Sequence, residues 1–325
     1  MNVYCFEEDK DFVNYLFLKD NNEYTLSEGP SNATLILHTP YPWAFSWEQR
    51  VEQALQQNPK RVIVFATELH SSTVEWIKRY PDFEYYLAGD VDFELKHKHY
   101  YMDWFAITRD FYKPRTHILE DIHNNSTNEY KYNALLGRVK PHRTGIYSHI
   151  LHDPKGIITY LHTHRDISNH VTDPGQFIWE GKPQSVNWTI DQIEYDGEMV
   201  SLSQVIPVDV YKQTEWCIVA ETNYHEGYVF FTEKVAKPIL AKKPFIIVGN
   251  PGSLALLHKL GFKTFDTIID ESYDSILTLN TRIEKIAQLI KQLPTGGYRE
   301  IVDHNYDLMM STDWQHVNII ERNIF

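Results

Sequence analysis

The sequence predicts an α/β fold made of two Rossmann-like lobes, each with a parallel sheet and flanking helices. Short apolar runs rich in β-branched residues alternate with segments of helical periodicity. This alternation stops at a polar stretch, EDIHNNSTNEY at 120–130, and starts again after it. The length of 325 residues also suits two domains of roughly 100–200 residues each. We therefore expect an N-terminal domain at 1–130 and a C-terminal domain at 131–325.

In the first lobe, apolar runs predict buried strands, and the segments between them carry apolar residues at helical spacing. The expected order is strand 33–38, helix 46–59, strand 60–70, helix 72–81 and strand 83–91. The polar stretch at 120–130 is expected to be a linker.

The second lobe repeats the pattern around a basic loop and a glycine turn. The expected elements are strand 131–137, loop 138–143, helix 144–153, strand 155–164, strand 216–222, a helix starting near Thr232, strand 244–249, a short strand at 262–270 and helix 275–293. Residues 165–200 show no clean period, which predicts an insertion or long loops. Ligands of open parallel sheets bind beyond the carboxyl ends of the strands, so we expect the lobes to face a substrate cleft.

The composition indicates a globular protein with an acidic surface. Hydrophobic residues make up 42% and charged residues 23%, and the formal net charge is −13, most of it in the first 130 residues. That charge argues against broad binding to nucleic acid or to anionic membranes. Cys5 and Cys217 lack metal-type spacing, and no apolar run is long enough to span a membrane, so we expect a cytoplasmic location.

The stretch FFTEKVAKP at 230–238 predicts an anion site at the start of a helix. A helix beginning near Thr232 or Glu233 has unpaired N–H groups and a positive dipole end there. Lys234 adds a point charge, and Lys237 follows one turn later. Glu233 would repel phosphate, so it is expected to accept hydrogen bonds from sugar hydroxyls. A capped helix with a solvated charged face explains the same residues equally well.

A second candidate site is the loop LLGRVKPHR at 135–143, which follows the first strand of the second lobe. Arg138, Lys140 and Arg143 are candidates for binding phosphate, because guanidinium and ammonium groups donate charge-assisted hydrogen bonds to it. The alternative is a basic loop that contacts the acidic first lobe.

Two further strand ends carry polar candidates. Glu221, in VAETNY, is expected to accept hydrogen bonds from ligand hydroxyls. Gly249 and Asn250, in VGNPGS, lie at a strand-to-helix turn where backbone N–H groups are expected to approach a ligand. The turn is neither a Walker motif nor a dinucleotide fingerprint.

The segment FFTEKVAKPILAKKPFIIVG resembles the C-terminal motif of GT-B-fold glycosyltransferases of the α-1,3-fucosyltransferase and exostosin type. That motif is a (S/T)EK step, a small-residue helix and an apolar P-x-x-x-G strand. The wider pattern over 131–275 also resembles proteins of tailed phages and large DNA viruses, which would place the chain in a host cytoplasm.

The resemblance implies a nucleotide-sugar donor of the UDP or GDP type, with no other cofactor and no bound metal. By the resemblance, Glu233 would hold donor hydroxyls, and Glu221 would face the sugar or ribose. Lys234 and Arg138 would neutralise the diphosphate. The acceptor would be a glycan or another hydroxyl compound.

Transfer with inversion needs a base for the acceptor proton, and we expect a first-lobe residue at a strand's carboxyl end. Glu68 is the leading candidate, with His38 and Asp90 as rivals; capping or turn roles are the alternative for each.

Several alternatives remain open. One is a non-catalytic nucleotide- or glycan-binding protein of the same fold. Another is a phage enzyme that glycosylates hydroxylated bases of DNA, which would need a basic face. A nucleotide-sugar epimerase or dehydrogenase is disfavoured, because no dinucleotide fingerprint is present. A metal site at His162, His164 and His170 is also disfavoured, because no HExxH motif or cysteine partner accompanies them.

Overall fold

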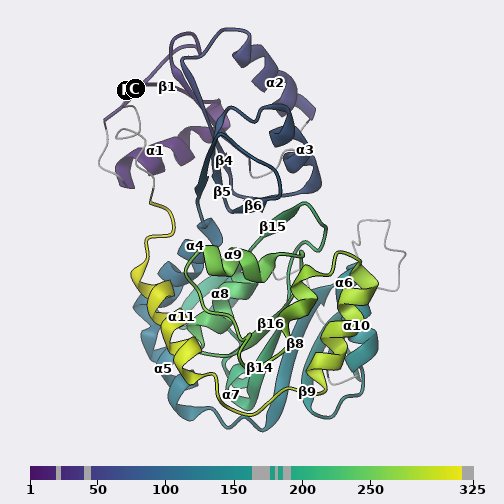
Figure 1. Ribbon diagram of the computed structural model, residues 1–325. Coiled ribbons are helices and arrows are strands. Elements are labelled where there is room, and N and C mark those ends of the chain that lie inside the picture. Colours follow the sequence, from purple (N-terminus) through teal and green to yellow (C-terminus); the bar gives the residue numbers. More distant parts are fainter. Residues whose placement is uncertain (20–22, 40–44, 163–175, 180–181, 186–191, 317–325) are drawn as a thin grey trace. The chain divides into compact units, whose positions relative to one another are not determined.

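The computed structural model describes residues 1–19, 23–39, 45–162, 176–179, 182–185 and 192–316, and the chain forms two compact units. Unit 1 comprises Met1–Ala106, Gly227–Phe230 and Asp313–Phe325, and unit 2 comprises Ile107–Glu226 and Phe231–Thr312. Each unit contains one six-stranded, mainly parallel sheet with helices packed on it (Figure 1). The predicted α/β class, with a parallel sheet in each lobe, is therefore confirmed.

The sheet of unit 1 has the order β2-β1-β3-β4-β5-β7, and every neighbouring pair in it is parallel. Its strands are β1 Asn2–Tyr4, β2 Thr25–Leu26, β3 Thr34–His38, β4 Arg61–Ala66, β5 Glu84–Leu87 and β7 His97–Tyr100. Its helices are α1 Lys10–Lys19, α2 Phe45–Leu55 and α3 Ser71–Arg79, and α4 Asp103–Tyr112 spans the division between the units.

Side chains alternate across the central strands of unit 1 and bury both faces of its sheet. Leu35 and Leu37 belong to a core cluster with Trp76 of α3. Ile36 points to the other face, into a cluster with Phe17 of α1. This alternation follows from the period of two in a strand, and it explains why α1 lies on one face and α2 and α3 on the other (Figure 1).

The prediction of a single strand at 83–91 is wrong, because strand β5 ends at Leu87 and a separate strand follows. Gly89–Val91 forms β6, which pairs antiparallel with β15 at Tyr228–Phe230. The pairing needs glycine, since a Cβ atom at Gly89 would lie 1.9 Å from the carbonyl oxygen of Val229. The glycine thus lets the 227–230 segment join unit 1.

The sheet of unit 2 has the order β11-β10-β9-β8-β14-β16. Its strands are β8 Tyr130–Arg138, β9 Gly156–His162, β10 Gln176–Trp179, β11 Lys182–Ser185, β14 Thr214–Ala220 and β16 Phe245–Val248. The four strands β9, β8, β14 and β16 are parallel, whereas β10 and β11 form an antiparallel edge. The first connection from β8 leads to β9 on one side, and the chain later returns to β14 on the other. Ligands of such sheets bind beyond the carboxyl ends of the strands that flank this reversal.

The helices of unit 2 pack around this sheet (Figure 1). They are α5 Thr116–Asn125, α6 Pro141–Ile150, α7 Val208–Gln213, α8 Glu233–Leu240, α9 Ser253–Lys259, α10 Leu279–Ile290 and α11 Arg299–Ser311. A hairpin of β12 Gln192–Tyr195 and β13 Glu198–Ser201 forms a separate small sheet.

Three sequence predictions for the second half of the chain are corrected. The expected linker at 120–130 contains most of α5, because Leu119 and Ile122 bury a face of that helix. The expected strand at 262–270 is a set of turns, in which the N–H groups of two isoleucines donate to the Phe265 carbonyl. The expected loop at 138–143 already contains the start of α6.

The division of the units differs from the predicted boundary at residue 130. The compact units divide after Ala106, and α5 belongs to unit 2 because it packs on α7. Lys212 of α7 donates hydrogen bonds of 3.0 and 3.2 Å to the Asp121 carboxylate of α5. The polar residues at 120–125 therefore lie on a packed helix rather than in a linker.

The close approach at Gly89 predicts that Gly89→Ala destabilises unit 1. The added methyl group must displace the β15 backbone, and such overpacking typically costs about 1–3 kcal/mol. Gly29→Ala is the matched control, because its Cβ atom would meet nothing nearer than 3.6 Å. Urea unfolding should show a lower midpoint for Gly89→Ala and no loss for Gly29→Ala; equal midpoints would contradict the packing argument.

Candidate functional site

The start of α8 is capped by the side chain of the residue before it. Thr232 has extended backbone angles, and its hydroxyl accepts a hydrogen bond from the Lys234 N–H at 3.4 Å. Helix α8 therefore begins where the sequence predicted. The cap occupies one of the four N–H groups that a helix start leaves without an intrahelical partner.

A buried carboxylate ties this helix start to the end of strand β14. Glu221, 1% exposed, follows the last residue of β14. Its carboxylate accepts hydrogen bonds from the Thr232 N–H at 3.0 Å, the Thr232 hydroxyl at 2.8 Å and the Thr222 N–H at 2.9 Å. About four acceptor positions exist on a carboxylate, so about one remains for a ligand. The contacts identify Glu221 chiefly as the support of the site.

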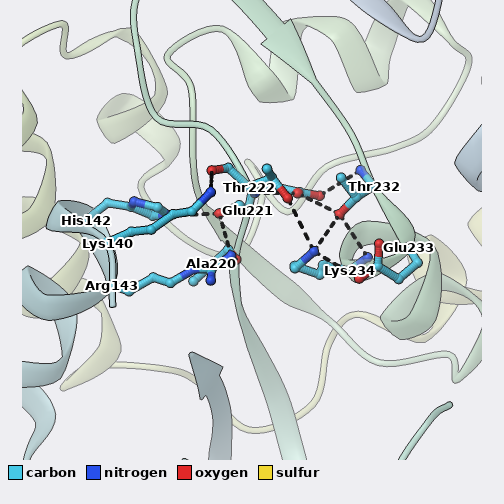
Figure 2. A network of polar contacts seen from close by, with 9 residues as sticks. All are labelled: Lys140, His142, Arg143, Ala220, Glu221, Thr222, Thr232, Glu233 and Lys234. Carbon is cyan, nitrogen blue, oxygen red and sulfur yellow. Dashed lines mark hydrogen bonds and ion pairs between the residues drawn. The ribbon is translucent and has the colours of Figure 1, made fainter. Parts of the chain in front are cut away.

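The ammonium group of Lys234 lies over these threonines (Figure 2). It donates to the Thr232 hydroxyl at 3.1 Å, to the Thr222 hydroxyl at 3.4 Å and to the Glu233 carboxylate at 2.9 Å. About 30% of the Lys234 side chain is exposed. The two hydroxyl contacts are long and neutral, so a ligand anion can replace them with shorter charge-assisted bonds.

Glu233 and Lys237 lie one helical turn apart on α8, and their charges act on each other. Burial would raise the pKa of Glu233, but Lys234 and Lys237 hold it below its usual value. Burial lowers the pKa of Lys237 to about 8, although the negative charge of Glu233 acts to raise it. In the described part of the chain, the Lys237 ammonium makes no hydrogen bond. The first turn of α8 therefore carries two cations, one carboxylate and the positive end of the helix dipole.

Residues of the predicted basic loop reach the same place from α6 (Figure 2). Lys140 donates to the Thr222 carbonyl at 2.6 Å, and Arg143 donates to the carbonyls of Ala220 and Glu221 at 3.2 and 3.0 Å. These acceptors are backbone groups of unit 2. The side chain of Arg138, the last residue of β8, lies outside the described residues.

His142 shows how tightly this basic segment is held. Its ring is fully buried and lies 2.8 Å from the Glu221 carbonyl, and it stacks on Tyr224 at 4.7 Å. Burial and the neighbouring Arg143 lower the pKa of His142 to about 3. The imidazole is therefore neutral at pH 7 and supports the site without adding charge to it.

Gly249 and Asn250 follow β16, beside the same strand end. A Cβ atom at Gly249 would lie 3.1 Å from the Glu221 Cβ atom, so glycine allows this close approach. The Asn250 side-chain amide donates to the His225 carbonyl at 2.7 Å and fixes the loop after β14.

The N–H groups at the start of α9, which follows this turn, already have an acceptor. Asp274 caps α9, and its carboxylate accepts a hydrogen bond from the Leu254 N–H at 3.0 Å. Burial raises the pKa of Asp274 to about 6, against the pull of these N–H groups. A partner 20 residues along the chain gives no local signal, which is why the sequence did not reveal it. The start of α8, rather than that of α9, is therefore the candidate anion site.

Another support that the sequence analysis missed is Arg282 of α10. Its buried guanidinium donates to the Tyr224 carbonyl at 2.8 Å and to the Ile276 carbonyl at 2.6 Å. It holds the loop after β14 from a helix 58 residues away. No sequence motif indicates that Arg282 and Tyr224 are in contact.

The three candidate bases lie in unit 1. Glu68 follows β4, and one of its carboxylate oxygens lies 3.1 Å from the His70 ring. In the described part of the chain, its second oxygen makes no hydrogen bond. Among the described residues, the imidazole is the hydrogen-bond partner of this carboxylate, which suits a group that must accept a proton.

The rivals are held more tightly. His38 ends β3, stacks on Phe12 at 3.9 Å and lies 3.1 Å from the Thr67 hydroxyl. Burial lowers the pKa of His38 to about 4. Asp90, on β6, is buried and accepts hydrogen bonds from Lys98 at 2.6 Å, Tyr100 at 3.0 Å and the N–H that follows it. The Asp90 carboxylate is thus committed to structural partners.

Within the described ranges, no cluster of histidine, cysteine, aspartate and glutamate has the arrangement of a metal site. His164 and His170 lie outside those ranges, as does the side chain of His162. Among the helices of the described part, none is long and apolar enough to cross a membrane.

The chain is similar to solved structures of α1,3-fucosyltransferase, at low sequence identity. The structure with GDP is 12% identical, covering 95% of this chain and 81% of that chain, with a TM-score of 0.41. The structure with GDP-fucose is 11% identical, covering 98% and 93%, with a TM-score of 0.43. A third structure is 10% identical, with a TM-score of 0.35. No family profile and no curated protein matches the chain.

The lowered pKa of Lys237 predicts how anion binding changes with pH. A bound anion favours the protonated lysine, so affinity should fall as pH rises above about 8, by at most tenfold per pH unit. Sulfate is the probe, because its charge is constant in this range. The measurement is the thermal shift by sulfate over chloride at pH 7.5 and 9.5 and equal ionic strength. Lys237→Met should remove the pH dependence; an unchanged profile in that variant would refute the assignment.

Proposed function

We propose that the chain is a glycosyltransferase that moves a sugar from a nucleotide-sugar donor to an acceptor hydroxyl. The observation that supports it is the grouping of Lys234, Lys140 and Arg143 around the end of β14 and the start of α8 (Figure 2). Lys237 follows one turn later on α8, where its charge acts on Glu233. A diphosphate matches this grouping, because its oxygens accept charge-assisted hydrogen bonds from ammonium and guanidinium groups. We take the donor to be of the UDP or GDP type.

The role of unit 2 in the reaction is to bind the diphosphate and stabilise its departure. As the bond between the anomeric carbon and the phosphate oxygen breaks, negative charge grows on the diphosphate. Lys234 and the α8 dipole are fixed before the reaction and favour that charge. Glu233 supplies a carboxylate for donor hydroxyls. These side chains carry enough positive charge for the step to proceed without a metal.

The role of unit 1 is to bind the acceptor and provide the base. We assign Glu68 as the base, because its carboxylate keeps one oxygen free of hydrogen bonds within the described residues. The acceptor oxygen attacks the anomeric carbon, its proton passes to Glu68, and the nucleoside diphosphate leaves. Configuration at the anomeric carbon is inverted, since one displacement occurs.

Lys234→Ala tests the diphosphate assignment. Loss of its charge-assisted bonds should weaken UDP or GDP binding by about 10- to 100-fold. The free energy of unfolding should change by less than about 1 kcal/mol, because the lysine is partly exposed. Affinity is measured by calorimetry, with Lys291→Ala, an exposed lysine of the same unit, as the control. Unchanged affinity in Lys234→Ala would remove the lysine from the site.

Glu68→Gln tests the base. The amide keeps the shape and loses the proton acceptor, so transfer from a bound donor should fall by about 10²–10⁴-fold while nucleotide affinity stays the same. Transfer is measured with a radiolabelled donor, in parallel with Glu75→Gln on the exposed face of α3. Normal transfer by Glu68→Gln would shift the role to His38 or Asp90. Nucleotide binding without turnover by the unmodified protein would instead favour a non-catalytic nucleotide-binding protein.

A further inference from the structure

A cavity of about 650 Å³ lies in unit 1, and none of the candidate bases lines it. Its walls come from three segments: the chain after β1, the chain after β2, and one side of α2. The volume is within the range of about 300–1,000 Å³ that is usual for small-ligand sites. All of these segments belong to one compact unit, so the walls are fixed with respect to each other.

The cations of this cavity are already neutralised. Arg50 of α2 lies over the Phe6 ring at 4.7 Å from its centroid and forms an ion pair with Glu8. Lys10 pairs with Glu7 at 2.5 Å. A phosphate or carboxylate ligand would have to break these pairs while facing two glutamates. The cavity therefore disfavours anions, in contrast to the site at α8.

Four polar side chains of the cavity have hydrogen-bonding capacity left. Among the described residues, no hydrogen bond is made by the Tyr4 hydroxyl, the Glu28 carboxylate or the side-chain amides of Gln53 and Gln57. The phenol and the amides both donate and accept, and the carboxylate only accepts. Leu26, 43% exposed, adds an apolar surface at the rim.

We propose that this cavity binds a neutral saccharide. Sugar hydroxyls both donate and accept, which matches the mixture of amides, phenol and carboxylate, and the C–H face of a pyranose ring can pack on Leu26. Glu28, Gln53 and Gln57 are exposed to solvent, and a lipid would remove them from water without giving them hydrogen-bond partners. Binding of a saccharide in this cavity does not require the protein to be a catalyst. Only the statement that the saccharide is part of the acceptor glycan rests on the proposed function.

Saccharide binding by the full-length chain tests the proposal. The probes are lactose, cellobiose and maltotriose, with inorganic phosphate and octanoate as the anionic and lipid-like comparisons. Binding is measured by saturation-transfer NMR and titration. At least one saccharide should bind, and Gln53→Met should weaken it by about tenfold, as expected for the loss of one or two hydrogen bonds. Gln56→Met is the matched control, since Gln56 is an exposed glutamine directly after α2 and does not line the cavity.

Glu28→Leu provides a second variant on another wall, with an expected loss of the same size. The proposal is overturned if no saccharide binds at millimolar concentration, if phosphate or octanoate binds instead, or if neither Gln53→Met nor Glu28→Leu weakens binding more than Gln56→Met. UDP and GDP binding is measured on the same samples. Nucleotide binding without saccharide binding would reject this cavity and leave the proposed function standing. Saccharide binding without nucleotide binding would support this cavity and reject the proposed function.

Discussion

The contact between the Glu221 carboxylate and Thr232 holds the site of unit 2 together. It joins the end of β14 to the start of α8, and the backbone carbonyl of Glu221 accepts from His142 and Arg143 of α6. One residue thus fixes the first turns of two helices at a single strand end. A buried carboxylate is tolerated there because its oxygens accept three hydrogen bonds; loss of these partners would leave a desolvated charge.

This arrangement leaves the strand end positively charged in an acidic protein. Lys140 and Arg143 donate to backbone carbonyls there, and Lys234 donates to two threonine hydroxyls and to the Glu233 carboxylate. The cations are Lys140, Arg143, Lys234 and Lys237, and the carboxylates are Glu221 and Glu233, so four positive charges face two negative ones. Unit 1 shows the opposite arrangement at Asp90, whose carboxylate is paired with Lys98. The excess of cations over carboxylates suits the first of these places to an anion.

The order of strands and helices was largely predictable, because apolar periodicity reflects burial directly. Strands β3, β4, β8 and β14 and helices α3 and α10 lie where the pattern placed them. The apolar periodicity gave a wrong prediction where a segment of polar composition is nevertheless packed against the rest of the unit. Helix α5 is polar over most of its length and is held by a few buried residues such as Leu119. Strand β6 is separate from β5 because it pairs with residues 228–230. These residues lie too far along the chain to be detected from the sequence around Leu87.

The same distinction separates what the sequence revealed of the site from what it missed. The start of α8 was predictable, because its cap and its charges are neighbours in sequence. Asp274 and Arg282 were not, because each acts on a strand end far from it along the chain. The Asp274 carboxylate accepts a hydrogen bond from an N–H group at the start of α9. The start of α8 is therefore better suited than that of α9 to bind an anion. Glu221 already accepts three hydrogen bonds and Glu233 is paired to Lys234, so few acceptor positions of these carboxylates remain for an attacking hydroxyl. A proton acceptor for an attacking hydroxyl is therefore better sought in unit 1, where the Glu68 carboxylate hydrogen-bonds, within the described part of the chain, to the His70 imidazole alone.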